Sequence, residues 1–479
     1  MPKTKVIEIE PLTRVEGHGK VTIHLDEHNN VDDARLHIVE FRGFERFIKG
    51  RPYWEVPVIV QRLCGICPVS HHLAASKAMD VIVGAKKITD TAEKMRRLMH
   101  YGQMFQSHVL HFFHLCSPDL LFGFGSDLKD RNVIGVIAKH PELATQAVMM
   151  RKFGQEIIKV TAGKKIHGTS SVPGGINKNL SIEERDPLLK QIDQMKEWTR
   201  GALKIAKDYT VEHLQLAKEF GTFNSSHLSL VREDGALDLY HGNLRAIDAN
   251  GNIIFDQVDY QKYYNFIMEE VRTWSYMKFP FIKTRGHVDG WYRVGPLSRM
   301  NTCGFIDTPE ADKALQEFKS VTNGKPNHMS LAYHWARMIE ITHCVEKMEE
   351  LLNDPDLQGT DLLVKGERQA EGVGLIEAPR GTLFHHYKVD ENDLVTFCNL
   401  IVSTTNNNEA MNRAVKNVAT RYLSGQQKIT EGMLNHVEVA VRAYDPCLSC
   451  ATHAIGQMPL KVELYDVNNN LIDEKSKGL

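Results

Sequence analysis

The chain has 479 residues, of which 42% are hydrophobic and 25% charged, and its formal net charge is -2. This balance is typical of a soluble globular protein and gives no electrostatic reason to expect nucleic acid or an anionic membrane as a partner. No apolar run approaches the ~18 residues of a membrane span, and the N-terminus lacks the apolar core of a signal peptide. We therefore expect a cytoplasmic protein with reduced thiols.

The chain contains no Ser/Gly-rich or Pro-rich linker, low-complexity segment or internal repeat that could mark a domain boundary. We therefore expect one intertwined unit. Within it we expect a sheet over about 1–50, a helical core over about 60–355 and a mixed part over about 370–453.

The first half of the chain predicts a sheet followed by long helices. Residues 6–48 alternate polar and apolar, with a turn at Glu27-His-Asn-Asn, which favours an antiparallel sheet. Asp90 followed by Glu93 resembles a capping box and predicts the start of a long buried helix that runs to Cys116. The same apolar spacing predicts helices over 142–161, 183–219, 258–275 and 329–353.

The C-terminal third has mixed patterns. Short apolar runs between 372 and 403, such as Val373-Gly-Leu-Ile, predict strands, and helical spacing returns over 405–423 and 430–443. The predicted fold class is α+β: a helix-dominated core of long helices, with small antiparallel sheets at the N-terminus and in the C-terminal third.

Two Cys-x-x-Cys pairs stand at opposite ends of this pattern, Cys64 with Cys67 and Cys447 with Cys450. Two intervening residues let a turn aim both sulfurs at one ion, and thiolates select zinc, iron or nickel over magnesium or calcium. The predicted core helices lie between the pairs and could bring them together. The pairs therefore predict a four-thiolate metal site.

A structural four-cysteine zinc site is the main alternative, because it is the commonest use of paired Cys-x-x-Cys motifs. Such sites usually close over roughly 15 to 20 residues, whereas these pairs are separated by most of the chain. The remaining cysteines are scattered and are interpreted as buried free thiols; they are Cys116, Cys303, Cys344 and Cys398.

Polar residues flank the pairs at offsets that suit hydrogen bonds to sulfur: His71, His453 and Asp445. Each alone is as well explained as a satisfied core residue, and Arg380, in Glu377-Ala-Pro-Arg-Gly, as an ion-pair partner. No complete dinucleotide or P-loop fingerprint occurs. The spare cysteines are too dispersed for a second cluster, so a redox metal here would pass its electrons to iron-sulfur centres on another chain.

With both pairs in place, the chain resembles the large, catalytic subunit of a nickel-iron hydrogenase. The resemblance runs through nearly the whole length in ordered motifs: Pro11-Leu-Thr-Arg-Val-Glu-Gly-His, Phe41-Arg-Gly-Phe-Glu, Arg62-Leu-Cys-Gly-Ile-Cys-Pro-Val-Ser-His, His167-Gly-Thr-Ser-Ser-Val-Pro-Gly-Gly, Glu377-Ala-Pro-Arg-Gly and Asp445-Pro-Cys-Leu-Ser-Cys-Ala-Thr-His. The sequences of these motifs are most similar to those of the cytoplasmic bidirectional, NAD-reducing branch.

The resemblance implies reversible heterolytic cleavage of molecular hydrogen, with all four paired cysteines as nickel ligands. Cys64 and Cys447 match the terminal ligands, and Cys67 and Cys450 match those that bridge to an iron carrying cyanide and carbon monoxide. Glu16 matches the glutamate that takes the proton from a terminal thiolate, for which we expect Cys447 to be the donor. This chemistry uses a Lewis-acidic metal with a thiolate and a carboxylate as base and relay.

Further residues match surrounding positions of the family. Arg380 matches the arginine over the open metal position, and Thr404 the hydroxyl next to a cyanide. His71 matches a hydrogen-bond donor to a bridging sulfur. A nearby magnesium site is matched by three groups: Glu45, the carbonyl of Leu400 and His453.

The same resemblance implies partners. It implies an iron-sulfur small subunit and, in many members of the branch, a flavin module that uses NAD. A hydrogenase linked to a deazaflavin or ferredoxin acceptor is the alternative within the family. A non-redox protein with structural zinc and a non-catalytic scaffold like the related subunit of respiratory complex I are the alternatives outside it; members of the latter group lack the cysteine pairs.

Two features depart from the family pattern. Ser107 stands where many periplasmic relatives carry an aspartate beside the arginine, which predicts a less acidic canopy over the metal. The chain also continues from Ala454 to Leu479, where the family removes a C-terminal extension by a maturation endoprotease. We interpret 454–479 as a cleavable extension. The alternative is a permanent strand, because Leu460-Lys-Val-Glu-Leu-Tyr alternates well.

Overall fold

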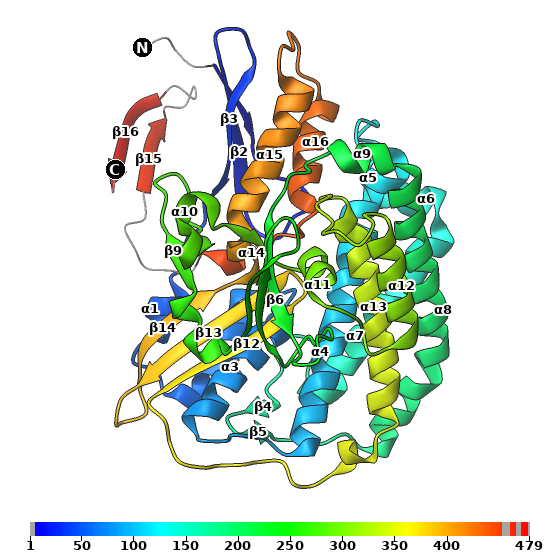
Figure 1. Cartoon of the computed structure of the whole chain (residues 1–479), viewed down its shortest axis with the longest axis vertical. Coiled ribbons are helices and arrows are strands. Elements are labelled where there is room, and N and C mark those ends of the chain that lie inside the picture. Colours follow the sequence, from blue (N-terminus) through cyan, green and yellow to red (C-terminus); the bar gives the residue numbers. More distant parts are fainter. Residues whose placement is uncertain (1–4, 453–459, 466–470, 478–479) are drawn as a thin grey trace.

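The computed structural model describes residues 5–452, 460–465 and 471–477, with side chains from residue 6 to residue 452. Its architecture is α+β (Figure 1). Long helices stand side by side on one side of the molecule, and small sheets, including the one formed by β12, β13 and β14, lie on the other. The predicted fold class is therefore confirmed. Among the described residues, no helix is both long enough and apolar enough to cross a membrane.

The N-terminal sheet has the strand order β1-β2-β3 and is antiparallel throughout; its strands are β1 (Lys5–Ile9), β2 (Gly19–Leu25) and β3 (Val31–Ile38). Asp26 shapes the turn between β2 and β3, because its carboxylate accepts the backbone N–H groups of His28 and Asn30 at 2.8 Å. The predicted hairpin is confirmed. Residues after Ile38 leave the sheet, and Phe44–Ile48 form the short helix α1.

Five long helices build the core. They are α3 (Pro68–Ile82), α4 (Asp90–Leu110), α7 (Pro141–Ala162), α8 (Ile182–Glu212) and α13 (Ala332–Leu352). Helix α4 packs against both α7 and α13, and α13 packs against α8. Beyond Leu110, α4 continues as a π-helical turn, η3 (His111–Cys116). The predicted helices over 142–161 and 329–353 are confirmed, and the segment 183–219 forms α8 and α9 (Leu214–Glu219), separated at His213.

Further helices, most of them shorter, connect these elements. They are α2 (Val56–Ile59), α5 (Ser117–Phe122), α6 (Val133–Lys139), α10 (Gly286–Asp289), α11 (Pro296–Thr302), α12 (Pro309–Ser320), α14 (Ser403–Asn406), α15 (Asn408–Leu423) and α16 (Glu431–Arg442). The helices predicted over 405–423 and 430–443 correspond to α14, α15 and α16 and are confirmed.

The remaining strands form several small sheets. They are β4 (Ser171–Val172), β5 (Gly175–Ile176), β6 (Ser226–Val231), β7 (Asn243–Ile247), β8 (Ile253–Val258), β9 (Ile267–Glu270), β10 (Phe279–Ile282), β11 (Tyr292–Arg293), β12 (Glu371–Ala378), β13 (Gly381–Val389), β14 (Val395–Ile401), β15 (Leu460–Tyr465) and β16 (Leu471–Lys477). The order β12-β13-β14 is antiparallel and confirms the strands predicted between 372 and 403. The strand predicted at 460–465 is β15, which pairs with β16.

The helix predicted over 258–275 is wrong. This segment contains the end of β8, a 3-10 turn (Tyr260–Asn265) and β9, which pairs with β10. Tyr263 and Ile267 instead pack in a cluster with residues of β12 and β13. Apolar residues three or four apart fit a turn followed by a strand as well as a helix, so tertiary packing decided between them.

The residue that caps the start of α4 differs from the prediction. Thr89 is the N-cap, since its hydroxyl accepts the N–H of Ala92 at 3.1 Å. Asp90 and Glu93 then lie inside the first turn, where negative charge interacts favourably with the helix dipole. The helix itself begins at Asp90, as predicted, and its N-cap lies one residue earlier than the capping-box pattern indicated.

Helix α3 lies directly on β12, and two glycines make this approach possible. A β-carbon at Gly374 would lie 1.9 Å from the carbonyl oxygen of Ala74, and one at Gly372 would lie 2.2 Å from that of Ala78. Real β-carbons do not approach backbone atoms so closely, so a side chain at either position would push α3 away from the sheet. Because Cys67 immediately precedes α3, this contact also fixes the first cysteine pair.

We expect Gly374→Ala to lower the free energy of unfolding by about 1–3 kcal/mol, the usual cost of overpacking. Gly201→Ala is the control, because Gly201 lies inside α8 and a β-carbon added there would have no atom within 4 Å; it should be neutral or stabilising by about 0.5–1 kcal/mol. Urea denaturation of both variants measures the difference, and equal effects would contradict the close-approach explanation.

Candidate metal centre

The two cysteine pairs meet inside the protein. The Sγ atoms of Cys64 and Cys447 are 3.1 Å apart and those of Cys447 and Cys450 are 2.9 Å apart, although Cys64 and Cys447 are separated by 383 positions in sequence. All four sulfur atoms lie within 4.8 Å of one another, and all four residues are buried free thiols. The predicted convergence of the pairs is therefore observed.

Local backbone geometry directs the first pair. Cys64 follows the 3-10 turn η2 (Val60–Leu63), and Cys67 stands at the N-terminal end of α3. The backbone N–H groups of Ile66 and Cys67 point at the Cys64 sulfur, at 3.2 and 3.3 Å. This is the turn expected of a Cys-x-x-Cys motif, and its N–H groups stabilise a negative sulfur.

The second pair is held by the N-terminal segment of the chain. The N–H of Leu448 donates to the carbonyl of Glu16 at 2.9 Å, and Glu16 and Cys447 form an isolated parallel bridge. The hydroxyl of Thr404, in α14, accepts the N–H of Cys447 at 2.9 Å. Segments from two distant parts of the chain thus fix the position of one cysteine.

The donor set suits a soft cation. Burial raises the pKa of the Cys447 and Cys450 thiols well above the usual value. Burial also opposes ionisation of Cys64, but hydrogen bonds from the other three thiols and the charge of Arg380 outweigh it and lower its pKa. Four thiolates cannot ionise together in a buried volume without a compensating cation, and four sulfurs select soft or borderline metals.

Glu16 lies against the second pair. Its Oε2 atom is 2.9 Å from the sulfur of Cys447, and it accepts the N–H of Ser449 at 3.2 Å. The hydroxyl of Ser449 donates to Oε1. The predicted neighbours Glu16 and Cys447 are therefore in direct contact. Ser449, which nothing in the sequence pattern singled out, orients the carboxylate.

Arg380 forms part of a cover over the sulfurs. Its Nε donates to the carbonyl of Asp445 at 2.6 Å and one terminal nitrogen to the Asp445 carboxylate at 3.1 Å, while its other terminal nitrogen is buried without a protein partner. Burial opposes the Arg380 charge, but Asp445 and the neighbouring thiols raise its pKa well above the usual value. Position 107 carries a buried serine and therefore supplies no carboxylate. The acid that contacts Arg380 is Asp445, from the second cysteine motif.

A cavity of about 10 Å³, the room of a single water molecule, lies beneath this cover. It is bordered by groups from both cysteine pairs, the arginine turn and α14, and its lining includes Cys67, His71, Arg380, Thr404 and Cys447. His71 faces His385, with 3.1 Å between Nδ1 and Nε2. A ligand in this space would have to be very small.

The predicted magnesium ligands are placed in part. Glu45 is buried on α1, and its Oε1 accepts the N–H of Leu400 on β14 at 2.9 Å. These two residues are therefore neighbours, through the N–H of Leu400 and not through the carbonyl that the resemblance assigns to the ion. His453 lies outside the described residues.

The structure brings together a second group of potential ligands that the sequence did not indicate: His111, Cys116 and His334. His111 is already engaged in hydrogen bonds. Its Nε2 lies 3.2 Å from the Cys116 sulfur and 2.7 Å from the carbonyl of Arg442. Burial and the charge of Arg337 lower the pKa of His111, and the same positive charge disfavours a bound cation. The geometry fits a hydrogen-bonded cluster.

Comparison with known proteins agrees with this centre. The family model described as nickel-dependent hydrogenase matches residues 42–121 and 218–453, and a model described as HoxL-like matches residues 6–41. The beta subunit of the NAD-reducing hydrogenase HoxS of Cupriavidus necator is 49% identical, covering 99% of this chain and 100% of the relative. The alpha subunit of sulfhydrogenase 2 of Pyrococcus furiosus is 30% identical, covering 94% and 99%.

Solved structures give the same result. A crystal structure of an NAD⁺-reducing NiFe-hydrogenase in the H2-reduced state is similar, with a TM-score of 0.92 and 57% identity, covering 94% of this chain and 100% of that one. A NiFeSe hydrogenase of Desulfovibrio vulgaris Hildenborough has a TM-score of 0.76 at 22% identity over 94% of this chain, which shows the shared fold alone.

The family, the fold and the buried four-sulfur site therefore agree. The residues present fit nickel and iron, since both metals accept thiolate ligands. The chain belongs to the nickel-dependent hydrogenase family and is an oxidoreductase that oxidises hydrogen at a nickel-iron centre.

Proposed function

We propose that the chain is the catalytic subunit of an NAD-linked hydrogenase that cleaves hydrogen reversibly, and that its four paired cysteines hold nickel and iron. The observation that carries the proposal is the gathering of four buried sulfurs within 4.8 Å. In this assignment Cys64 and Cys447 are terminal nickel ligands. Cys67 and Cys450 would hold both the nickel and an iron that carries cyanide and carbon monoxide.

The size of the cavity supports hydrogen as the substrate. Pockets for organic ligands usually occupy roughly 300–1,000 Å³, whereas the space beside the sulfurs is about 10 Å³. An organic substrate does not fit so small a space. When bound, the metals supply Lewis acidity that polarises hydrogen and makes one of its atoms acidic.

Glu16 is the proposed proton relay. Cleavage of hydrogen releases two protons and two electrons, and the first proton needs a base next to the metals. The sulfur of Cys447 serves as that base, and the Glu16 carboxylate at 2.9 Å is within the range of direct proton transfer. The hydroxyl and N–H of Ser449 hold the carboxylate toward the sulfur.

The groups on the opposite side of the cavity have orienting roles. The buried terminal nitrogen of Arg380 that lacks a protein partner provides a positive charge over the open position. Thr404 presents its hydroxyl beside a cyanide, and His71 donates toward a bridging sulfur. These roles for Thr404 and His71 are carried over from the family, and both residues line the cavity.

A magnesium ion completes the proposed site, with Glu45, the carbonyl of Leu400 and His453 as its protein neighbours. The contact between Glu45 and Leu400 supports this assignment for two of the three. Oxygen ligands of this type suit magnesium, which usually keeps several waters.

The electrons are proposed to leave through an iron-sulfur small subunit and to reach NAD on a flavin-containing diaphorase module. Two of the similar proteins support this route, because one is a subunit of an NAD-reducing hydrogenase and the other is an NAD⁺-reducing hydrogenase. A cytoplasmic location belongs to the same proposal. Ferredoxin-linked or deazaflavin-linked relatives define the alternative acceptor.

Residues 1–453 are proposed to form the mature unit, and residues 454–479 an extension that a maturation endoprotease removes. The extension begins immediately after His453, so its removal would leave a magnesium neighbour at the new C-terminus. Strands β15 and β16 pair with each other as a hairpin, which gives the extension a structure of its own.

We expect purified holoenzyme to contain both nickel and iron, and its infrared spectrum to show cyanide and carbon monoxide bands that protein groups lack. Metal analysis and infrared spectroscopy of one sample provide the test. Zinc alone, without these bands, would establish the structural-zinc alternative instead.

We expect Glu16→Gln to retain the metals but to lose nearly all exchange between hydrogen and solvent deuterium, because the amide cannot relay a proton. Glu40→Gln is the matched control, since Glu40 pairs with His18 at the surface near the same segment; its exchange rate should match the unchanged protein. Retained exchange in Glu16→Gln would rule out the relay role.

We expect the intact mass of the large subunit in active enzyme to correspond to a chain ending at His453. Mass spectrometry of the active holoenzyme measures this end directly. Activity in a subunit that still ends at Leu479 would favour the permanent strand.

A further inference from the structure

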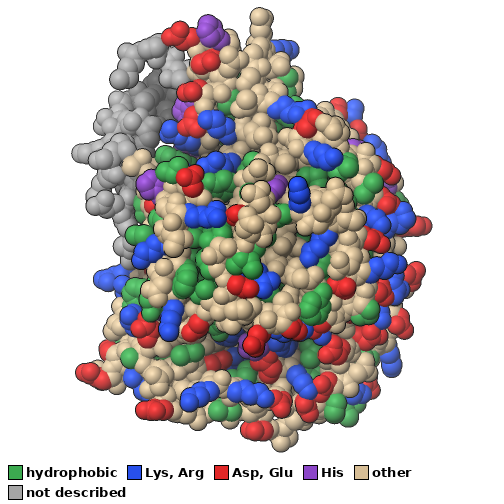
Figure 2. All heavy atoms as spheres, in the orientation of Figure 1, with side chains coloured by type: hydrophobic (Ala, Val, Ile, Leu, Met, Phe, Trp, Pro, Cys, Tyr) green, Lys and Arg blue, Asp and Glu red, His purple; other side chains and the backbone are tan. Residues whose placement is uncertain are grey.

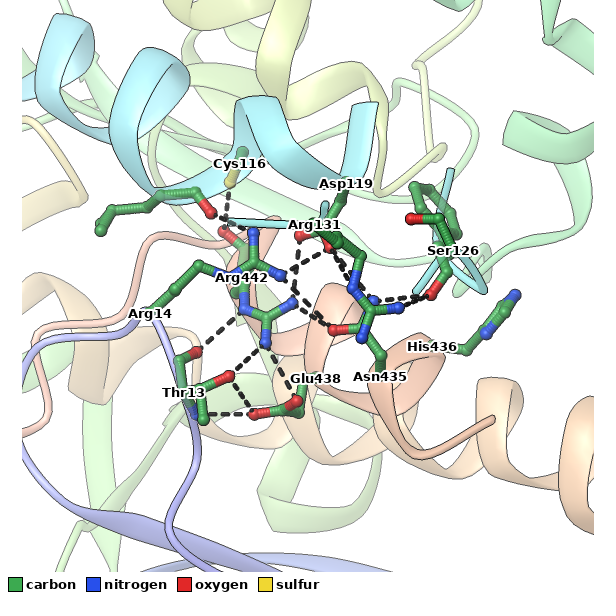
Figure 3. Close-up of polar contacts among 12 residues, drawn as sticks. Thr13, Arg14, Cys116, Asp119, Ser126, Arg131, Asn435, His436, Glu438 and Arg442 are labelled. Carbon is green, nitrogen blue, oxygen red and sulfur yellow. Dashed lines mark hydrogen bonds and ion pairs between the residues drawn. The ribbon is translucent and has the colours of Figure 1, made fainter. Parts of the chain in front are cut away.

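A buried carboxylate lies between the two segments that carry Glu16 and Cys447. Asp119, on α5, is 2% exposed and accepts hydrogen bonds from Arg14 at 2.6 Å and from Arg442 at 3.0 Å. The amide of Asn435 donates to the same carboxylate at 3.1 Å. Figure 3 shows these side chains converging from the N-terminal loop, α5 and α16.

Arg442 connects this carboxylate to the N-terminal loop. Its Nε donates to the carbonyl of Thr13 at 2.9 Å and a terminal nitrogen to the Thr13 hydroxyl at 2.8 Å. Glu438, one turn earlier on α16, accepts the N–H of Thr13 at 2.6 Å and its hydroxyl at 2.9 Å. The two side chains, which also pair with each other, therefore hold one residue of the N-terminal loop against α16, as Figure 3 shows.

The charges of this cluster are balanced. Arg14, Arg131 and Arg442 approach Asp119, while Glu438 pairs with Arg442 and Glu431 with Arg131. A buried ion pair contributes little net stability but is costly to break, which makes it suited to fixing geometry. We call Thr13, Arg14, Asp119, Asn435, Glu438 and Arg442 the Asp119 network.

The backbone of the N-terminal loop depends on the network. Arg14 has φ 54, in the left-handed region that non-glycine residues seldom adopt. Its guanidinium donates to the carbonyl of Leu115 and to Asp119, which holds this conformation. The left-handed residue turns the chain two positions before Glu16, so the direction of the Glu16 side chain depends on this turn.

The other end of the network acts on the second cysteine pair. Arg442 is the last residue of α16, and the segment after it leads to Cys447. Arg442 donates hydrogen bonds to Thr13, so the segment that leads to Glu16 and the segment that leads to Cys447 are joined just before they reach the site. This connection constrains the distance between Glu16 and Cys447. The parallel bridge between Glu16 and Cys447 is a second connection between the same two segments.

We propose that the Asp119 network consists of positioning residues that set the distance between the Glu16 carboxylate and the Cys447 sulfur, and thereby the rate of proton transfer from the metal centre. The proposal rests on the proposed relay role of Glu16. It assigns a function to Thr13 and Asp119, neither of which contacts the cysteines in the described structure.

The decisive variant is Thr13→Val in the assembled holoenzyme. Thr13 is exposed, so the change leaves the core intact while it removes the hydroxyl shared by Glu438 and Arg442. We expect full nickel content, exchange between hydrogen and D2O slower by about tenfold, and a higher ratio of HD to D2 in the product. Displacements of about 1 Å at a reacting pair can cost ~10²-fold, and Asp119→Asn should approach that loss.

The isotope ratio separates positioning from stability. Slow proton transfer lets hydrogen leave after a single exchange, which enriches HD, whereas a smaller folded fraction lowers the rate without changing the ratio. Thr13→Ser keeps the hydroxyl and should restore both values. Thr145→Val is the control, because its hydroxyl makes one exposed bond to Pro141 on α7; it should change neither.

An unchanged ratio of HD to D2 in Thr13→Val overturns the proposal, whatever happens to the rate, and so does failure of Thr13→Ser to restore the ratio. Glu16→Gln measured in parallel separates the two levels. If Glu16→Gln loses exchange while Thr13→Val keeps the normal ratio, only the Asp119 network fails. If Glu16→Gln keeps exchange, the relay fails and the positioning proposal fails with it.

Discussion

Four sulfur atoms have to share a volume from which water is excluded, although they belong to segments separated by 383 positions. Closing so long a loop costs entropy, and burying thiol groups that must ionise costs more. The packed helices between the segments and the bound metal are what compensate these costs. The fold can therefore be understood as a rigid frame that brings Cys64 and Cys67 against Cys447 and Cys450.

Charged side chains are spread over the outer face shown in Figure 2. The interior also uses buried charges in addition to apolar packing. Arg299 is fully buried and bonds two glutamates, Glu340 at 2.6 Å and Glu377 at 2.7 Å. Glu377 precedes the turn that carries Arg380, so this pair fixes the cover of the metal site. Such pairs add little net stability, but they permit one arrangement only.

Chemistry at the centre is divided between its two sides. Glu16 and Ser449 lie against Cys447, on the side where we propose that a proton leaves, and Arg380 with Asp445 lies on the side proposed for the open metal position. The cavity of about 10 Å³ beside Arg380 and Cys447 leaves no room for bulk water, and exclusion of water strengthens electrostatic interactions in the site. A small, dry and charged site suits a substrate that has no functional group to recognise.

Local spacing and ordered motifs were enough to identify the family, the two cysteine pairs, Glu16, Arg380 and most of the long helices, because that information is written in short stretches of sequence. They placed the N-cap of α4 one residue late and predicted a helix where β9 lies, since the packing of Tyr263 and Ile267 against a distant sheet has no local signal. Tertiary packing alone paired Asp445 with Arg380, joined Ser449 to Glu16 and assembled the Asp119 network. These contacts join residues whose proximity depends on how α4, α5 and α16 pack, and that packing is a property of the whole chain.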